Sequence, residues 1–404
     1  MNRIHTISMR LRCLTPVFAG NGEKFKPSEY IYDRYNQRVY FLKESAWIQF
    51  LYDKRIFPSY SQNLIEKISQ GGTFSIYEWL ENHFLRQSGF RNMQELLRDL
   101  ETKGVVEKGE KADVKAPSQR NRGRYHAPRD SKGSVNEVLR FARTAGEVYI
   151  PGSTLKGAFR TAVLVQMIDK ASVSTRTRLW GDVSRSYNKW SANNAGKDLE
   201  KTLATGKLRN LKKPDFVLDS LFRGLSVSDA MPESYELGIV QKVDWGDQAA
   251  KRGRDPKNLP IYRESLLPGS MLTFQVSIDA SVMAEAGIQN VDDLLEALRA
   301  FTNLQHDLIR KIFDSSYLDA MEKADLLLGG GTGYISKTLV YPLAPDKEAG
   351  TRVVRKLMTD QFRWHKHEED RDISPHTMKL TRWNGEIQMM GLCQLEVLSD
   401  DCLR

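Results

Sequence analysis

The sequence predicts a mixed α/β (α+β) protein whose core follows the order β-α-β-β-α-β, the ferredoxin-like arrangement. Three observations predict this core. Apolar and polar residues alternate over 4–18, as in a strand with one buried face. A Pro-Gly pair at 151–152 opens one amphipathic helix, and a second helix covers about 291–313, before the glycine-rich turn 326–338. Strand-like segments between and after the two helices complete the pattern.

The segment between the first strand and the first core helix predicts a hairpin and then a helical insertion. Residues 30–42 are rich in strand formers and are expected to turn at Asn36. Helical patterns follow near 44–54, 61–69, 75–87 and 92–101. Their composition differs from that of their flanks. We therefore expect a helical insertion with a basic loop at 44–145, protruding from a core made of 1–43 and 146–345.

The second half of the chain is expected to supply mainly strands. Strand patterns cover 219–230, 236–245, 270–279 and 390–398, whereas 246–258 has the composition of a polar loop. The stretch from the glycine-rich turn to Leu343 is also strand-like. Residues 346–404 are expected to form a C-terminal extension that packs on the core.

Composition and charge limit the possible functions. The chain has 404 residues, a net charge of +9 and a pI near 9.2, which favours a polyanionic partner. No apolar stretch is long enough to span a membrane, and the first residues lack the apolar core of a signal peptide. Three scattered cysteines fit a reducing compartment. We therefore expect a cytoplasmic protein without a membrane partner.

The segment 149–163 predicts a phosphate-binding helix start. A Pro-Gly break precedes Ser153, which can cap a helix, and two cations then follow four residues apart on one face. A turn with exposed amides, a helix N-terminus and two cations together suit a phosphate. An ordinary strand–turn–helix with a solvated Lys/Arg pair is the alternative. The candidate contacts are Gly152, Ser153, Thr154, Lys156 and Arg160.

The segment 115–132 predicts a flexible basic loop. Arg120, Arg122 and Arg124 lie beside Tyr125, so that cations can neutralise phosphates while the ring stacks on a base. A solvated linker is the alternative interpretation. His126, in the same loop, is the histidine that acid–base cleavage of RNA would use first.

Two enzyme classes have partial motifs here. Ser153-x-x-Lys156, then Ser228-Asp229 and Lys337-Thr338, follow the order of motifs in penicillin-recognising acyl enzymes. Two of those three motifs differ from the acyl-enzyme pattern at their last residue, and the chain has no export signal. The second class is the nucleotide hydrolases: Gly152 and Gly157 have the spacing of the Walker glycines, but the Lys-Ser/Thr pair of that motif does not follow them. The sequence therefore identifies no catalytic residue and no cofactor.

A metal site is not expected either. Histidines and acids gather in one short segment, but they lack a His-Glu-x-x-His spacing. We expect a charged, solvated loop with no bound metal at His365, His367, Glu368, Glu369 and Asp370.

Several motifs, in order along the chain, resemble those of the RAMP superfamily. Residues 150–160 are similar to its Ile-Pro-Gly-Ser-Ser-Leu-Lys-Gly-x-x-Arg motif, and 329–338 are similar to its glycine-rich loop. Shorter matches fall at 15–20, 179–181, 221–229 and 262–270. The chain resembles the Cas7-like subunits of the type III-A CRISPR (Csm) effector complex. Among these it resembles the Csm5 family, the member at the 3′ end of the guide RNA (crRNA).

This resemblance implies a non-catalytic RNA-binding subunit with an RRM-like core. It implies that the subunit caps the 3′ end of the crRNA, meets target RNA through the complex and contacts neighbouring Csm backbone and small subunits. It also implies roles in crRNA maturation, with a possible host 3′-trimming nuclease, and in antiviral defence. RNA contact carries over by motif to the helix start and to Gly329, Gly330, Gly331, Thr332, Gly333 and Lys337. Contacts should reach phosphate and sugar, because the guide sequence varies while the protein does not.

An RNA-cutting enzyme is the alternative function. In related backbone subunits, a loop carboxylate after the first strand cuts target RNA with a divalent metal. Glu23, Glu29 and Asp33 lie near that place, and none sits in a recognisable motif. Nuclease activity is therefore not transferred to this chain. A RAMP-type endoribonuclease that processes guide RNA or cuts target RNA remains the alternative.

Overall fold

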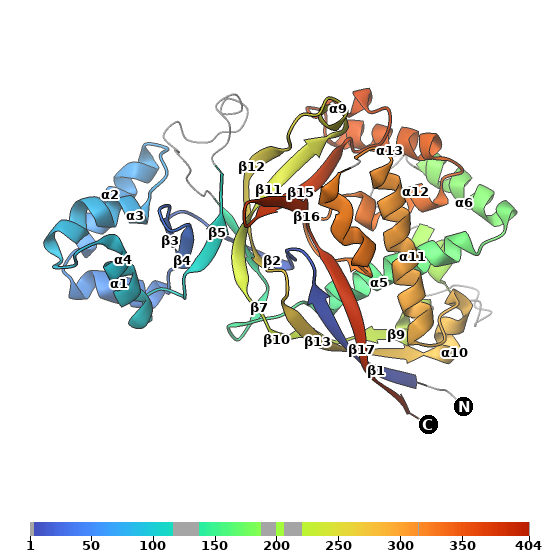
Figure 1. Cartoon of the computed structure of the whole chain (residues 1–404), viewed down its shortest axis with the longest axis horizontal. Helices are drawn as coiled ribbons and strands as arrows, with labels where there is room; N and C mark the ends of the chain where they lie inside the picture. The colour runs from blue at the N-terminus through green and yellow to red at the C-terminus, as the bar shows by residue number, and fades with distance from the viewer. Residues whose placement is uncertain (1–3, 116–136, 187–198, 206–219, 314, 404) are drawn as a thin grey trace.

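The computed structural model describes residues 4–115, 137–186, 199–205, 220–313 and 315–403 (Figure 1). Two sheets with helices packed around them form a mixed α/β fold, which confirms the predicted class. Arg120, Arg122, Arg124 and His126 lie outside the described residues.

The first sheet is built around the N-terminal strand β1 (Ile4–Cys13). Its alternate residues Ile7, Met9, Leu11 and Cys13 are at most 1% exposed, as the period of two predicts. β1 pairs antiparallel with β13 (Met271–Asp279) on one side and with β17 (Leu392–Leu403) on the other. The order is β10-β13-β1-β17-β14, with β9 also on β13, where β9 is Leu225–Val227, β10 is Met231–Ser234 and β14 is Leu326–Leu327.

Two long helices pack on this sheet and on each other. They are α5 (Gly152–Asp169) and α11 (Val291–Arg310), which lie side by side in Figure 1. Asn290 and Asp293 form a capping box that fixes where α11 begins. Apolar side chains of both helices share one buried cluster with β1. Burial of these faces, at about 25 cal/mol per Å², is the main force that joins the helices to the sheet.

The second sheet has nine strands and carries most of the polar groups discussed below. Its order is β2-β6-β12-β11-β5-β4-β3, and the β15–β16 hairpin is attached to β11. The strands are β2 (Gly20–Phe25), β3 (Tyr30–Asp33), β4 (Arg38–Phe41), β5 (Glu110–Asp113), β6 (Val138–Phe141), β11 (Leu237–Gly246), β12 (Lys257–Leu266), β15 (Thr377–Trp383) and β16 (Glu386–Met389). The β3–β4 hairpin confirms the predicted turn near Asn36. The turn is held by the Asp33 carboxylate, which accepts the N–H groups of Tyr35 and Asn36.

A buried ion network joins β6 to β12. Glu264 is fully buried, and its carboxylate accepts the N–H of Phe141 at 2.8 Å. The Arg143 guanidinium donates to both Glu264 oxygens, at 2.6 and 2.7 Å. Burial opposes ionisation of Glu264, but hydrogen bonds with the Arg143 and Glu110 side chains lower its pKa overall. The carboxylate is therefore held ionised and ties the two strands together.

The helices predicted for the segment after the β3–β4 hairpin are present, and they project from the rest of the molecule at the left of Figure 1. They are α1 (Glu44–Asp53), α2 (Phe57–Ser69), α3 (Ile76–Trp79), η1 (Leu80–Phe84), η2 (Leu85–Gln87) and α4 (Met93–Thr102). These helices have their own apolar cluster, which includes Trp47, Leu51 and Leu96. The segment does not remain outside the sheets, because β5 and β6 join the second sheet.

The prediction for the stretch ending at Leu343 was wrong. That stretch forms the short helices η7 (Ile335–Lys337) and α12 (Val340–Leu343), and α13 (Lys347–Gln361) follows. A short apolar run fits a buried helix as well as a strand, and packing against α5 and α13 decides for the helix. The segment predicted as an extension also supplies a central strand, because β17 pairs with β1 from Ile4 to Cys13.

Apart from the 14-residue helix α6, the remaining elements are short. They are β7 (Arg143–Thr144), β8 (Glu147–Val148), α6 (Val173–Ser186), η4 (Leu221–Gly224), α9 (Asp247–Lys251), α10 (Ala280–Met283), η5 (Ala284–Ala286), η6 (Ser316–Lys323) and η8 (His367–Glu369). None of the helices in the described ranges has the length and hydropathy needed to cross a bilayer.

Candidate nucleic-acid interface

The predicted helix start at Gly152 is mostly occupied by the protein itself. The Asp229 carboxylate accepts the N–H of Gly152 at 2.7 Å, so an internal anion sits where a phosphate was expected. Thr154 and Leu155 donate their N–H groups to the carbonyl of Pro151. A Cβ on Gly152 would lie 2.4 Å from the carbonyl oxygen of Val227. This glycine therefore serves close packing between α5 and β9.

The predicted capping role of Ser153 is wrong. The N-cap of α5 is Pro151, which has no side chain for capping, and Ser153 is an exposed residue inside the helix. The helix begins two residues earlier than it would with Ser153 as its N-cap, because Asp229 supplies the cap from another segment. Thr154 is half-buried beside it.

The two cations of this helix differ in their surroundings. Arg160 has its Nε 3.2 Å from a Glu200 carboxylate oxygen, and its Cζ lies 5.4 Å from the centre of the Phe222 ring. Partial burial lowers the pKa of Lys156, and the nearby charge of Arg160 lowers it further. Arg160 is thus already paired, and Lys156 is the freer of the two for an external anion.

The glycine loop, residues 329–333, is held against two other turns of the chain. Gly330 donates its N–H to the carbonyl of Phe18 at 2.7 Å, and a Cβ on Gly329 would lie 2.1 Å from that same oxygen. Gly391 donates to the carbonyl of Pro16, and Leu328 donates to the carbonyl of Gly391. Three turns are thereby locked together at the ends of β1, β14 and β17.

The glycine loop also offers free backbone donors. Gly329, Gly331 and Gly333 have φ of +83°, +88° and +88°, whereas the residues between them do not have positive φ. Alternation of left- and right-handed residues turns successive N–H groups toward one side and forms an anion-binding concavity. Within the described part of the chain, no group accepts from the N–H groups of Gly331 and Gly333, whereas the turn at 330–331 brings the Thr332 N–H toward the Gly329 carbonyl. The Thr332 hydroxyl donates internally, to the Gly329 carbonyl, at 3.2 Å.

Cations from three strands of the second sheet and one short helix surround the glycine loop. We call Lys242, Arg263, Lys337 and Lys379 the cation cluster. A Cβ on Gly331 would lie 3.7 Å from Cζ of Arg263, and one on Gly333 would lie 3.3 Å from Cγ of Lys379. Sequence reasoning missed three of the four, because β11, β12 and β15 bring them together from distant parts of the chain.

The cation cluster is short of negative charge. Asp244 lies opposite Lys379 in the β11–β15 register, and its carboxylate is 2.9 Å from the Lys379 Nζ and 3.6 Å from the Lys242 Nζ. Burial lowers the pKa of Lys242; Asp244 opposes this, and Lys379 and Arg263 lower it further. Burial and Arg263 likewise lower the pKa of Lys337. An anion placed here would relieve mutual repulsion among the cations.

A cavity of about 640 Å³ opens beside the loop and the cluster. Its lining includes Thr332, Gly333, Lys242, Asp244 and Lys379. The lining also includes apolar residues of α11 and α13 and histidines of the segment 365–376. The cavity therefore combines cations and backbone amides with apolar and imidazole surfaces.

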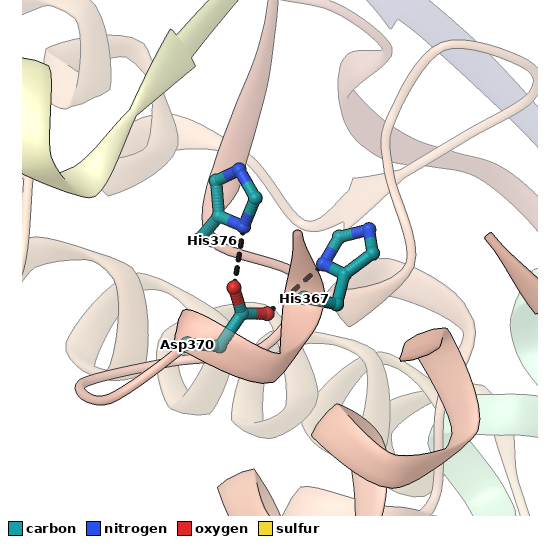
Figure 2. Close-up of side chains that lie close together, drawn as sticks. All are labelled: His367, Asp370 and His376. Atoms are coloured by element: carbon teal, nitrogen blue, oxygen red, sulfur yellow. Dashed lines mark hydrogen bonds and ion pairs between the residues drawn. The ribbon is translucent and has the colours of Figure 1, made fainter. Parts of the chain in front are cut away.

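The prediction of a solvated loop at 365–370 was wrong for two of its residues. His367 and Asp370 are buried, and His376 from the start of β15 joins them, as Figure 2 shows. His365, Glu368 and Glu369 are exposed, as expected. No local spacing pointed to His376, because the chain turns back on itself between it and His367.

Of the three carboxylates weighed as nuclease residues, two have structural roles. Asp33 is 1% exposed and holds the β3–β4 turn. Glu29 accepts the N–H of Lys26 across a local turn. Glu23 lies exposed on β2. The geometry around these residues does not assemble a shared metal-binding or acid–base group.

A comparison with protein-family models identifies the superfamily of this chain. The model described as "RAMP superfamily" matches residues 10–334, which include both the helix start and the glycine loop. The chain belongs to the RAMP superfamily.

Two curated proteins with similar sequences carry the same name. Over 395 residues the chain is 26% identical to the CRISPR system Cms protein Csm5 of Mycobacterium tuberculosis (strain ATCC 25618 / H37Rv), and the match covers 96% of each chain. It is 27% identical over 344 residues to the protein of that name from Streptococcus thermophilus, covering 84% of this chain and 81% of the relative.

Solved structures show the same fold. A chain of the cryo-EM structure of a Csm–crRNA–target RNA ternary complex from a type III-A CRISPR-Cas system matches with a TM-score of 0.61 and 18% identity, covering 97% of this chain and all of that one. The crystal structure of T. onnurineus Csm5 matches with a TM-score of 0.55 and 17% identity, covering 95% and 99% of the two chains.

Proposed function

We propose that this protein is the crRNA-binding subunit at the 3′ end of a type III-A CRISPR (Csm) effector complex, and that it does not itself cut RNA. The names of its relatives and the complex that contains a chain of the same fold support this proposal. In this role it contacts crRNA directly, target RNA through the complex, and neighbouring Csm subunits. Maturation of the crRNA 3′ end with a separate trimming nuclease belongs to the same proposal.

We also propose that the first sheet with α5 and α11 is a ferredoxin-like core. In a β-α-β-β-α-β chain the strand order is 4-1-3-2. The first sheet has this order, with β17 or β14 as the fourth strand, β1 as the first, β13 as the third and β9 or β10 as the second. These strands pair antiparallel. The fourth strand of this core is then completed by the last residues described.

The observation that carries the RNA-binding proposal is the glycine loop facing the cation cluster. Free N–H groups and unbalanced positive charge at one surface recognise a phosphate, and neither reads a base. The helix start has a smaller role in this proposal, because Asp229 and Glu200 already occupy it.

The test measures the binding of short single-stranded RNA to the full chain at several salt concentrations. The variant Lys242→Gln, Lys337→Gln, Lys379→Gln should bind about 100-fold more weakly, since each lysine lost removes roughly one phosphate contact. Its slope of log affinity against log salt should be shallower by about 2, at about 0.7 for each phosphate. Two RNAs of unrelated sequence should behave alike, and RNA recovered from the mixtures should be uncut.

A matched control removes the same charge elsewhere. The control set consists of three exposed lysines: Lys54 directly after α1, Lys67 on α2 and Lys108 before β5. The triple glutamine variant of this set should keep most of the affinity for RNA. An equal loss in both triple variants would show that net charge alone binds RNA, and the proposed interface would be wrong. Single-site cleavage that survives repurification would instead favour the nuclease.

A further inference from the structure

A second group of side chains lies at the same cavity, which two of its members, His367 and His376, line. His367 on η8, Asp370 just after it and His376 before β15 converge within ten residues of chain (Figure 2). The Asp370 carboxylate lies between the two imidazoles: Oδ2 is 3.0 Å from Nδ1 of His367, and Oδ1 is 2.5 Å from Nδ1 of His376. One donor atom from each residue lies within 4.8 Å of those of the other two.

These three groups are fixed in place and shielded from water. The Asp370 side chain is 1% exposed and that of His367 is 8% exposed, whereas His376 remains 29% exposed. The Ser374 hydroxyl donates to Asp370 Oδ2 at 2.6 Å, and the Arg355 guanidinium donates to the Asp370 carbonyl. Burial opposes ionisation, but hydrogen bonds from His376, Ser374 and His367 lower the pKa of Asp370 overall. The carboxylate is thus an anion at neutral pH.

The donor set has a definite chemical preference. Two imidazole nitrogens and one carboxylate oxygen suit borderline divalent transition cations, with Zn²⁺ foremost, rather than Mg²⁺ or Ca²⁺, which prefer oxygen alone. Both histidines line the 640 Å³ cavity, so a further position on a bound ion would face open space. This matches the pattern of three protein ligands and one open position.

Acidic groups lie near the three residues, together with the Arg355 guanidinium and the Lys366 ammonium, which is paired with Glu369. Asp247 is buried near His376 and donates its N–H to the His376 carbonyl at 2.8 Å. Glu368 and Glu369 are on the same short helix as His367. Lys379 opposes them, but its ammonium is paired with Asp244.

We infer that His367, Asp370 and His376 bind one divalent transition-metal ion of the Zn²⁺ class, through one nitrogen of each imidazole and the Asp370 carboxylate. The ion takes the place of the protons that the two imidazoles now share with Asp370, and each ring then carries its proton on the other nitrogen. The inference does not depend on RNA binding, because none of these residues belongs to the glycine loop or the cation cluster.

The experiment uses the full chain, stripped with a chelator and then titrated with Zn²⁺ or Co²⁺. Equilibrium dialysis with elemental analysis should give one ion per chain, and Co²⁺ should show the visible absorption of a site with nitrogen ligands. Zn²⁺ should raise the Tm of the wild-type chain, since an ion that binds the folded state stabilises it. The double variant His367→Gln, His376→Gln should lose about 100-fold or more in affinity and show no shift in Tm.

Two further variants make the result decisive. Asp370→Asn keeps the shape of the carboxylate without its charge and should also weaken binding, whereas His83→Gln, in the distant helical insertion, should not. Circular dichroism identifies any variant that fails to fold, and Asp370→Asn then carries the test. Absence of stoichiometric binding by the wild type, or equal affinity in the wild type and the double variant, would show that the three residues are only a hydrogen-bonded network.

Discussion

The helix start at Gly152 and the glycine loop at 329–333 drew attention for the same reason, yet the fold uses them differently. In both segments the sequence combines glycine turns, whose backbone N–H groups are expected to be exposed, with nearby lysines. At the helix start, Asp229 takes the Gly152 amide and Glu200 pairs with Arg160. At the glycine loop, the amides of Gly331 and Gly333 have no acceptor among the described residues, and Lys242 and Lys379 of the cation cluster share one carboxylate, that of Asp244. A motif predicts donors, but the rest of the fold decides whether those donors are still available.

The largest expected difference between the two turns is in stability. Gly152→Ala places a methyl group 2.4 Å from the Val227 carbonyl, and neither backbone can move away easily. We expect a loss of about 3 kcal/mol in the free energy of unfolding. Denaturant unfolding measures it, and RNA affinity per folded molecule should not change.

Gly157 provides the matched control for that substitution. It lies in the same helix with open space where a Cβ would stand. Gly157→Ala should raise stability by about 0.5–1 kcal/mol, since alanine is the better helix former. If Gly152→Ala folded as stably as wild type but lost RNA binding, the helix start would be the RNA site and the comparison would be reversed.

A medium effect is expected at Asp229. Asp229→Ala removes the acceptor of the Gly152 N–H and a negative charge at the start of α5. The free energy of unfolding should fall by about 1–2 kcal/mol, the usual range for a lost helix cap. RNA affinity should stay within about twofold of wild type, whereas a large gain would mean that Asp229 had been competing with phosphate at this turn.

A small effect, on RNA binding alone, is expected from the two cations of α5. From the sequence alone, Lys156→Glu together with Arg160→Glu is predicted to weaken RNA binding by more than the loss of one contact would, because repulsion replaces attraction. Because Arg160 is already paired with Glu200, we expect no more than about a threefold loss beyond that of an equal charge reversal at Lys54 and Lys67. A filter-binding titration against salt measures both variants. A loss comparable to that of the triple glutamine variant would restore the helix start to the interface.

The sequence predicted those elements whose signal is local. Alternation over β1 and β13, the helical period of α11, and the helices between the β3–β4 hairpin and β5 all depend on neighbouring residues. The β15–β16 hairpin and most of β12 were missed. The polar side chains of these strands resemble loop composition until the pairing with β11 gives them a buried face.

What the sequence by itself determined was the class of fold, the superfamily and the position of a glycine-rich loop, because periodicity and short motifs are properties of adjacent residues. Only the tertiary structure decided which groups face that loop. Lys242, Arg263 and Lys379 come from three strands far apart in the chain, and His376 reaches Asp370 only after the chain turns back. Distances between such residues are set by strand pairing and core packing, which no local pattern in the sequence records.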